Sequence, residues 1–174
     1  MISKELARAI NDQMVFELYS SYIYLGLSAA LEKLKLPGAA HWMRMQVDEE
    51  LIHANIFYNY LNDQDAEIEL GKIDKVSTKV KSAKEAFELA LKHERIVTGR
   101  INQLCALAMK NSQFATLTFL NFFVREQVQE ERSVQQIIDK LELAENSREA
   151  LLFIDKELGL RAAPTVPAAA QATL

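Results

Sequence analysis

Residues 45–57 of the chain, MQVDEELIHANIF, have the composition of an α-helix and lie in a stretch free of proline and glycine. Helical spacing places Glu50 and His53 on the face that also carries Phe57 and Tyr60. Those two aromatic rings indicate the buried side of the helix. Burial of a carboxylate lowers the stability of a protein unless another group balances its charge. The balancing group for Glu50 has to be sought in the rest of the sequence.

The length and composition predict one globular domain without a polyanionic partner. The chain has 174 residues, with 20 Lys and Arg against 24 Asp and Glu, and a net charge of −4. We find no basic patch interleaved with aromatic residues, so we expect no nucleic-acid partner. The single cysteine, Cys105, cannot form an internal disulfide, and we expect it to be a small buried apolar residue.

Neither export nor membrane insertion is expected. The first residues, MISKELARAINDQM, contain no apolar segment typical of a secretion signal. No apolar run approaches the roughly 18–20 residues of a membrane helix. The sequence therefore predicts a cytoplasmic protein with no membrane contact.

The pattern of helix formers and breakers predicts an all-α fold. Only five glycines and three prolines interrupt the chain. We expect long helices over about 3–35, 37–61, 82–110 and 113–143, and a short fifth helix that follows a cap in NSRE (146–149) and ends near Gly159. Ser82 and Glu85 have the spacing of a capping box. The connection over 62–81 is too long for a hairpin, which favours a four-helix bundle with one long crossover.

The domain is expected to cover residues 1–160. The remaining residues, 161–174, are rich in alanine and proline. We expect them to form a disordered tail.

Each long helix carries one inward stripe, with steps of three and four residues, that is apolar at its ends and polar near its middle. The stripes are Ile10, Met14, Glu17, Ser21, Tyr24, Ser28 and Leu31; Met43, Gln46, Glu50, His53, Phe57 and Tyr60; Phe87, Ala90, Glu94, Val97, Ile101, Leu104 and Ala108; and Leu120, Phe123, Gln127, Glu130, Val134, Ile137 and Leu141. The polar residues of all four helices should meet at one level of the bundle.

Four buried carboxylates at one level require either protonation or cations. The stripes contain no Lys or Arg, whereas two divalent metal ions would balance Glu17, Glu50, Glu94 and Glu130. Glu50 and His53 could bind one ion together, since residues three apart share a helix face. Oxygen ligands with one nitrogen suit iron(II), manganese or zinc. A single E-x-x-H would more often be a solvated pair, so the prediction depends on the agreement of all four helices.

Four further ring-bearing side chains of the long helices need an interpretation. We expect Trp42 to serve packing, and we assign no role to His41 or His93. Tyr24 lies one heptad after Glu17, and two interpretations stay open for it: a core residue with a bonded hydroxyl, or a redox-active phenol next to the metals. On the second interpretation Tyr24 is a candidate catalytic residue.

With these motifs in place, the chain resembles the non-haem ferritins of bacteria and archaea, from Met1 to about Leu160. The iron ligands of that family are matched by Glu17, by EELIH with Glu50 and His53, by KHERI with Glu94, and by REQVQEE with Gln127 and Glu130. It implies two irons per subunit: Glu17, Glu50 and His53 hold the first, Glu50 bridges, and Glu94 and Glu130 hold the second. Tyr24 matches the tyrosine beside that centre.

The resemblance also implies a third, transit iron site, with Glu49 and Glu126 among its ligands. Such sites usually have a glutamate just before the position of Glu130, and here that residue is Gln129. We therefore expect the third site to be weaker.

Departures from related families exclude some cofactors. Bacterioferritins bind haem through a methionine directly after the bridging glutamate, where this chain has Leu51, so no haem is expected. A single cysteine cannot supply the iron domain of a rubrerythrin. Leu117 and Leu120 stand where eukaryotic shells have acidic channel residues.

The activity that the resemblance implies is oxidation of Fe(II) by dioxygen or peroxide. The ferric mineral would be stored inside a hollow shell of 24 identical subunits. Two alternatives remain: a di-iron oxygenase or peroxidase that keeps its metals, and a structural bundle whose polar layer fixes the helix register.

Overall fold

The computed structural model describes residues 2–145 and 147–166, and all regular structure in these residues is helical. The helices are α1 (Lys4–Lys33), α2 (Pro37–Asp63), α3 (Ala83–Lys110), α4 (Phe114–Leu143) and α5 (Arg148–Leu158). The prediction of an all-α four-helix bundle with a short fifth helix is confirmed.

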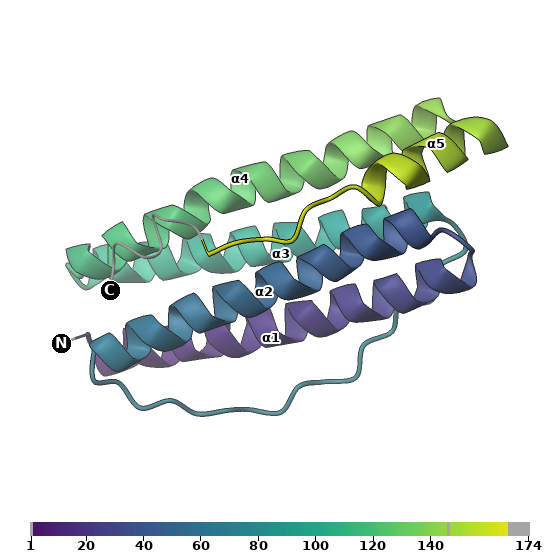
Figure 1. The fold of residues 1–174 in the computed structure, drawn as a ribbon. Helices are drawn as coiled ribbons and strands as arrows, with labels where there is room; N and C mark the ends of the chain where they lie inside the picture. Colours follow the sequence, from purple (N-terminus) through teal and green to yellow (C-terminus); the bar gives the residue numbers. More distant parts are fainter. Residues whose placement is uncertain (1, 146, 167–174) are drawn as a thin grey trace.

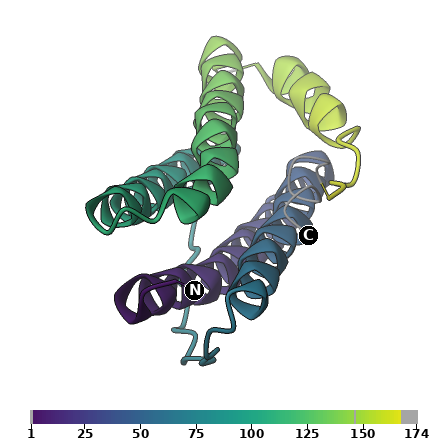
Figure 2. The same cartoon turned by 90° about the vertical axis from the view of Figure 1, so that its left-hand side faces the viewer.

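The four long helices form two antiparallel hairpins (Figures 1 and 2). α1 packs mainly on α2, and α3 packs mainly on α4. The crossover between α2 and α3 runs along the outside of α1 for most of the length of the bundle (Figure 1). It is tied to α1 by Asn11, whose Nδ2 donates to the Glu69 carbonyl at 2.9 Å and whose Oδ1 accepts from the Glu69 amide at 3.0 Å.

The helix ends follow local rules. Half of the predicted capping box is present: Ser82 Oγ accepts from the Glu85 amide at 3.1 Å. Glu85 Oε2 accepts from the amide of Lys81, one residue before the cap, at 2.7 Å. α5 is capped by Ser147, whose Oγ accepts from the Ala150 amide at 3.1 Å. Asn146, the first residue of the predicted NSRE cap, lies outside the described residues.

All members of the four predicted stripes are buried. The apolar members fall into two separate clusters, and the carboxylates, His53 and Gln127 belong to neither. One cluster includes Tyr24, Leu27, Leu31, Met43, Phe87 and Ile137, and the other includes Ile10, Met14, Phe57, Tyr60, Ile101 and Phe123. The core is therefore divided by a polar layer, as the alternation along each stripe predicts.

Two expectations need correction. Cys105 is only half-buried, at the edge of the second apolar cluster, so the expectation of full burial is wrong. By length and composition alone α1 is apolar enough to cross a membrane, which the sequence analysis did not anticipate. Its most apolar window is 44% buried inside the bundle. The core helix of a soluble protein passes the same test of length and composition, so the result is weak evidence for a membrane span.

The start of α2 is capped from α5. Leu36 precedes the helix and offers no side-chain cap, but the Asp155 carboxylate accepts from the Gly38 amide at 3.1 Å and from the Ala39 amide at 2.8 Å. A carboxylate at this end also interacts favourably with the helix dipole. Gly38 is required for the approach, because a Cβ there would lie 1.7 Å from the Asp155 carbonyl oxygen.

The segment after α5 starts against α2. His41 Nε2 donates to the Arg161 carbonyl at 2.9 Å, and the Arg161 guanidinium lies over Trp42. Trp42 is buried and packs edge-on against Phe87, in agreement with its predicted packing role. Of the expected tail, residues 161–166 are described, and residues 167–174 lie outside the described residues.

We predict that Gly38→Ala undocks α5 and lowers the free energy of unfolding by about 2 kcal/mol, because the new methyl group collides with backbone atoms. The melting temperature of the apo-protein should fall by about 4–8 °C. Gly99→Ala is the matched control, since its Cβ meets nothing within 4 Å and should add about 0.5–1 kcal/mol of helix stability. Equal melting temperatures for the two variants would contradict this account of α5.

Candidate metal centre

The polar layer contains side chains from all four long helices: Glu17 on α1, Glu50 and His53 on α2, Glu94 on α3, and Gln127 and Glu130 on α4. All six are buried. The charges of Glu17, Glu94 and Glu130 all raise the pKa of Glu50, so the four carboxylates lie close together inside the bundle. The structure thus brings together the residues that the sequence analysis selected for the two-ion site.

Glu94 is held by two neutral donors. The Tyr24 hydroxyl donates to its Oε1, and Gln127 Nε2 donates to its Oε2 at 3.0 Å. Gln127 Nε2 also lies 3.3 Å from the Glu94 carbonyl oxygen, so the amide is fixed from two sides. The hydroxyl of Tyr24 therefore has a defined partner inside the layer.

Glu17 is held by a residue that the sequence analysis missed. Gln13, one turn earlier on α1, is buried and donates from Nε2 to Glu17 Oε1 at 2.8 Å. The amide is oriented in turn by Arg100, whose Nε donates to Gln13 Oε1 at 2.7 Å. The i, i+4 spacing of Gln13 and Glu17 was the available signal, but the position of Arg100 on α3 could not be read from it.

Glu50 and His53 lie side by side, with His53 Nδ1 at 3.6 Å from Glu50 Oε2. The His53 ring packs edge-on against Phe123, at 5.6 Å between ring centres. The Oε2 atoms of Glu17 and Glu50 are buried and have no hydrogen-bond partner among the described residues. Unpaired buried acceptors of this kind are suited to a cation.

Burial and mutual repulsion raise the proton affinity of the carboxylates. Burial, and then the charge of Glu17, raise the pKa of Glu50 well above its ordinary value. Burial, followed by the charges of Glu49 and Glu94, raises the pKa of Glu130 to about 8. The pKa values of Glu17 and Glu94 are also raised, chiefly by burial. Without a cation, the layer favours bound protons.

Burial also raises the pKa of Tyr24 well above that of a free phenol, with the charge of Glu94 as the next cause. Tyr24 therefore remains a protonated donor at neutral pH. His93, to which we assigned no role, is buried next to this region, and its Nε2 lies 2.7 Å from Ser20 Oγ. Burial lowers the pKa of His93 to about 4, so it is neutral at pH 7.

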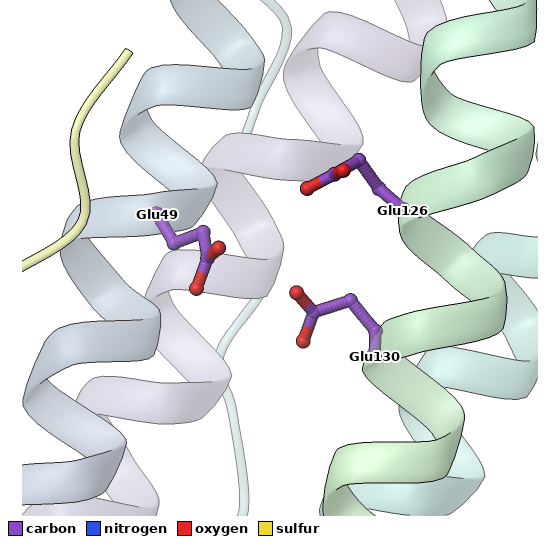
Figure 3. A group of neighbouring side chains, drawn as sticks. All are labelled: Glu49, Glu126 and Glu130. Carbon is purple, nitrogen blue, oxygen red and sulfur yellow. The ribbon is translucent and has the colours of Figure 1, made fainter. Parts of the chain in front are cut away.

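A second acidic group lies beside the layer, between α2 and α4. Figure 3 shows Glu49 on α2 facing Glu126 and Glu130 on α4. One oxygen of each carboxylate lies within 4.8 Å of the others, and among the residues that the structure describes this is the one group of three that meets that distance. Glu130 also accepts from Gln46 Nε2 at 3.1 Å, so it borders both sites.

Glu49 and Glu126, the two residues that the resemblance implies for a third site, lie together in this group. The glutamate that such sites usually have at position 129 is a glutamine here. Gln129 is exposed, and Glu130 supplies the third carboxylate instead.

Comparisons with known proteins show the family of the chain. The profile of the ferritin-like domain matches residues 7–144. The bacterial non-heme ferritin of Escherichia coli O157:H7 is 38% identical over 158 residues, 91% of this chain and 96% of its own length. That of Bacteroides fragilis strain 638R is 39% identical over 161 residues, 92% of this chain and its full length.

Solved structures give the same result. An open pore ferritin from the archaeon Archaeoglobus fulgidus superposes with a TM-score of 0.92 and 38% identity, covering 93% of this chain and all of that chain. A structure described as a humanized archaeal ferritin superposes with a TM-score of 0.91 and 40% identity, covering 93% of this chain and 99% of that chain. With a profile match over most of its length and relatives above 30% identity, the chain belongs to the ferritin-like family.

Proposed function

We propose that the protein stores iron, and that it oxidises Fe(II) with dioxygen at the polar layer before depositing the product as a ferric mineral. The observation that carries the proposal is the group of four buried carboxylates, two of them with unpartnered oxygens and none paired with a Lys or Arg. In a ferritin-like chain, such a site is suited to binding cations that arrive as substrate.

In this proposal Glu17, Glu50 and His53 bind one Fe(II), Glu50 bridges, and Glu94 and Glu130 bind the second. Two Fe(II) ions carry four positive charges and balance four ionised carboxylates. Each ion gives one electron, so dioxygen is reduced to hydrogen peroxide when two protons are taken up. Carboxylate oxygens then favour the harder Fe(III) ion.

Two neighbours adjust the site. Tyr24 donates to Glu94 and Gln127 does so from the other side, so we assign both to holding that carboxylate in place. Gln127 brings a neutral amide and no negative charge to the second iron, which is therefore bound less firmly than it would be with a further carboxylate. Release of the oxidised product is thereby favoured over its retention.

Glu49, Glu126 and Glu130 are proposed to hold a third iron in transit, more weakly than the first two. No haem is part of the proposal. Leu51, which stands where bacterioferritins have the haem-binding methionine, is 39% exposed on α2.

Assembly into a homo-oligomer is supported by the apolar side chains that the single chain exposes. Tyr22 and Leu25 on α1, Tyr58 on α2 and Phe153 on α5 are between 43% and 71% exposed. Side chains of this size are better covered by further copies than by water. We propose a closed shell of 24 subunits in the cytoplasm, as the sequence analysis expects.

The two alternatives are separated by iron binding. A di-iron oxygenase would keep its two ions through many turnovers, and a structural bundle would take up none. Anaerobic titration with Fe(II) followed by admission of air distinguishes them: storage requires two tightly bound ions per chain first, and many more per assembly after oxidation.

We predict that Glu50→Ala lowers the initial rate of Fe(II) oxidation by about 100-fold or more, because the bridging carboxylate is lost. Shell assembly should be retained, as gel filtration can check. Glu88→Ala, at an exposed position of α3, is the matched control and should oxidise Fe(II) at the wild-type rate. A Glu50→Ala protein with wild-type kinetics would overturn the site.

The apo-protein should lose stability as the pH rises. The Glu50 carboxyl holds its proton above the ordinary pKa of 4.5 in the folded state, and Glu130 does so up to about 8. The unfolded chain releases these protons near 4.5, so their stabilising effect is present at low pH and is lost as the pH rises through the folded pKa values.

We therefore predict that Glu50→Gln, which removes one charge from the layer, raises the apo melting temperature more at pH 8 than at pH 5. The extra gain at pH 8 should be about 3 °C or more, as measured by calorimetry of the metal-free protein at both pH values. Glu88→Gln should show no such difference. A gain of equal size at both pH values would argue against repulsion among the carboxylates.

A further inference from the structure

The segment that follows α5 brings a cation to the edge of the third-iron group. Asp155 fixes α5 on the first turn of α2, and His41 Nε2 then donates to the Arg161 carbonyl at 2.9 Å. The yellow trace beside α2 in Figure 3 is the chain after α5, close to Glu49. The backbone at Arg161 is thus held where its side chain can follow α2.

The Arg161 side chain spans two turns of α2. Its guanidinium lies over the Trp42 ring, at 4.3 Å from the ring centre, and its Nη2 donates to Glu49 Oε2 at 2.6 Å. Trp42 and Glu49 are seven residues apart and therefore share a helix face. Both members of the ion pair are largely shielded, with 24% and 18% of their side chains exposed, so salt screens the pair less than it would a fully exposed one.

Glu49 is also one of the three carboxylates that face each other in Figure 3. A guanidinium on Glu49 Oε2 occupies one of its two oxygens and places a positive charge beside the group. A divalent ion at Glu49, Glu126 and Glu130 would compete for the same carboxylate and would be repelled by that charge.

We propose that Arg161 is an internal competitor for the third iron, and that ion binding at this group requires the guanidinium to leave Glu49. This inference rests on the proposed function, since it concerns the third of the proposed iron sites. The coupling is reciprocal: if docking of Arg161 on Glu49 weakens ion binding by a given factor, ion binding weakens the docking of Arg161 by the same factor.

The hydrogen bond between Arg161 and Glu49 has a form that a bound ion can displace. Arg161 meets Glu49 through a single nitrogen and not in the bidentate form that makes such pairs strongest. Its other terminal nitrogen, Nη1, is buried without a hydrogen-bond partner among the described residues. Occupation of the third site would then be reported by a movement of the segment after α5, away from Trp42.

The test compares the wild type with Arg161→Gln, Arg161→Lys and Lys156→Gln in the assembled metal-free protein. Zinc(II) alone is the probe, because it has no redox chemistry and accepts oxygen and nitrogen ligands. Calorimetric titration should show two tight binding steps in all four proteins. Arg161→Gln should tighten only the third step, by about tenfold, as loss of one charge-assisted contact implies.

Two controls separate charge from structure. Arg161→Lys keeps the charge and should stay near the wild type. Lys156→Gln removes a charge from an exposed position of α5 without touching Glu49, and should also match the wild type. A third step that is unchanged or weaker in Arg161→Gln would overturn the inference.

Fluorescence gives an independent readout, because Trp42 is the single tryptophan of the chain. In the wild type its emission should change at the third zinc step, when the guanidinium leaves the ring, and in Arg161→Gln it should not. Emission that stays constant through the third step of the wild type would also overturn the inference. Absence of the first two steps would instead overturn the proposed two-ion centre.

Discussion

The repulsion between four carboxylates that share the middle of the bundle is the constraint on which the rest of the structure depends. It divides the apolar core into two clusters, because no hydrocarbon can fill the level at which the acidic groups meet. The groups that contact these carboxylates directly are largely uncharged. Gln13, Gln127, Gln46 and the Tyr24 hydroxyl each donate a hydrogen bond to one of them. Neutral donors fix the geometry and leave the negative charge for a bound cation.

Arg100 and Arg161 lie near the polar layer, but neither pairs directly with Glu17 or Glu50. Arg100 reaches Glu17 through the side chain of Gln13, and Arg161 pairs with Glu49 at the edge of the layer. Direct pairing of either arginine with Glu17 or Glu50 would cancel the charge that a metal ion needs. Because neither arginine pairs with Glu17 or Glu50, the charge of these two carboxylates stays available for the ions of the proposed function.

Much of the fold and of the site could be predicted because both depend on local periodicity. Steps of three and four residues identified every buried stripe, and the four polar interruptions identified the level at which Glu17, Glu50, Glu94 and Glu130 meet. The helix cap at Ser82 is likewise a property of neighbouring residues.

The features that escaped prediction join residues distant in sequence. The cap that Asp155 places on α2 spans more than one hundred residues, and the pairing of Arg161 with Glu49 depends on how the chain leaves α5. That Glu130 joins Glu49 and Glu126 as the third member of the acidic group depends on the actual rotation of α4. None of these contacts has a repeating pattern along the chain that would predict it. The direction of a long connection and the rotation of a helix are set by tertiary packing alone.

The division into two hairpins has a consequence for how the protein folds. Glu17, Glu50 and His53 belong to the α1–α2 hairpin, while Glu94, Gln127 and Glu130 belong to the α3–α4 hairpin. Each hairpin forms through contacts close in sequence, which are made quickly, whereas docking across the long crossover needs distant contacts and is slower. Glu17 already repels Glu50 within the first hairpin, and docking of the second hairpin adds the charges of Glu94 and Glu130. Part of the electrostatic cost of this chain is therefore met only when the two hairpins come together.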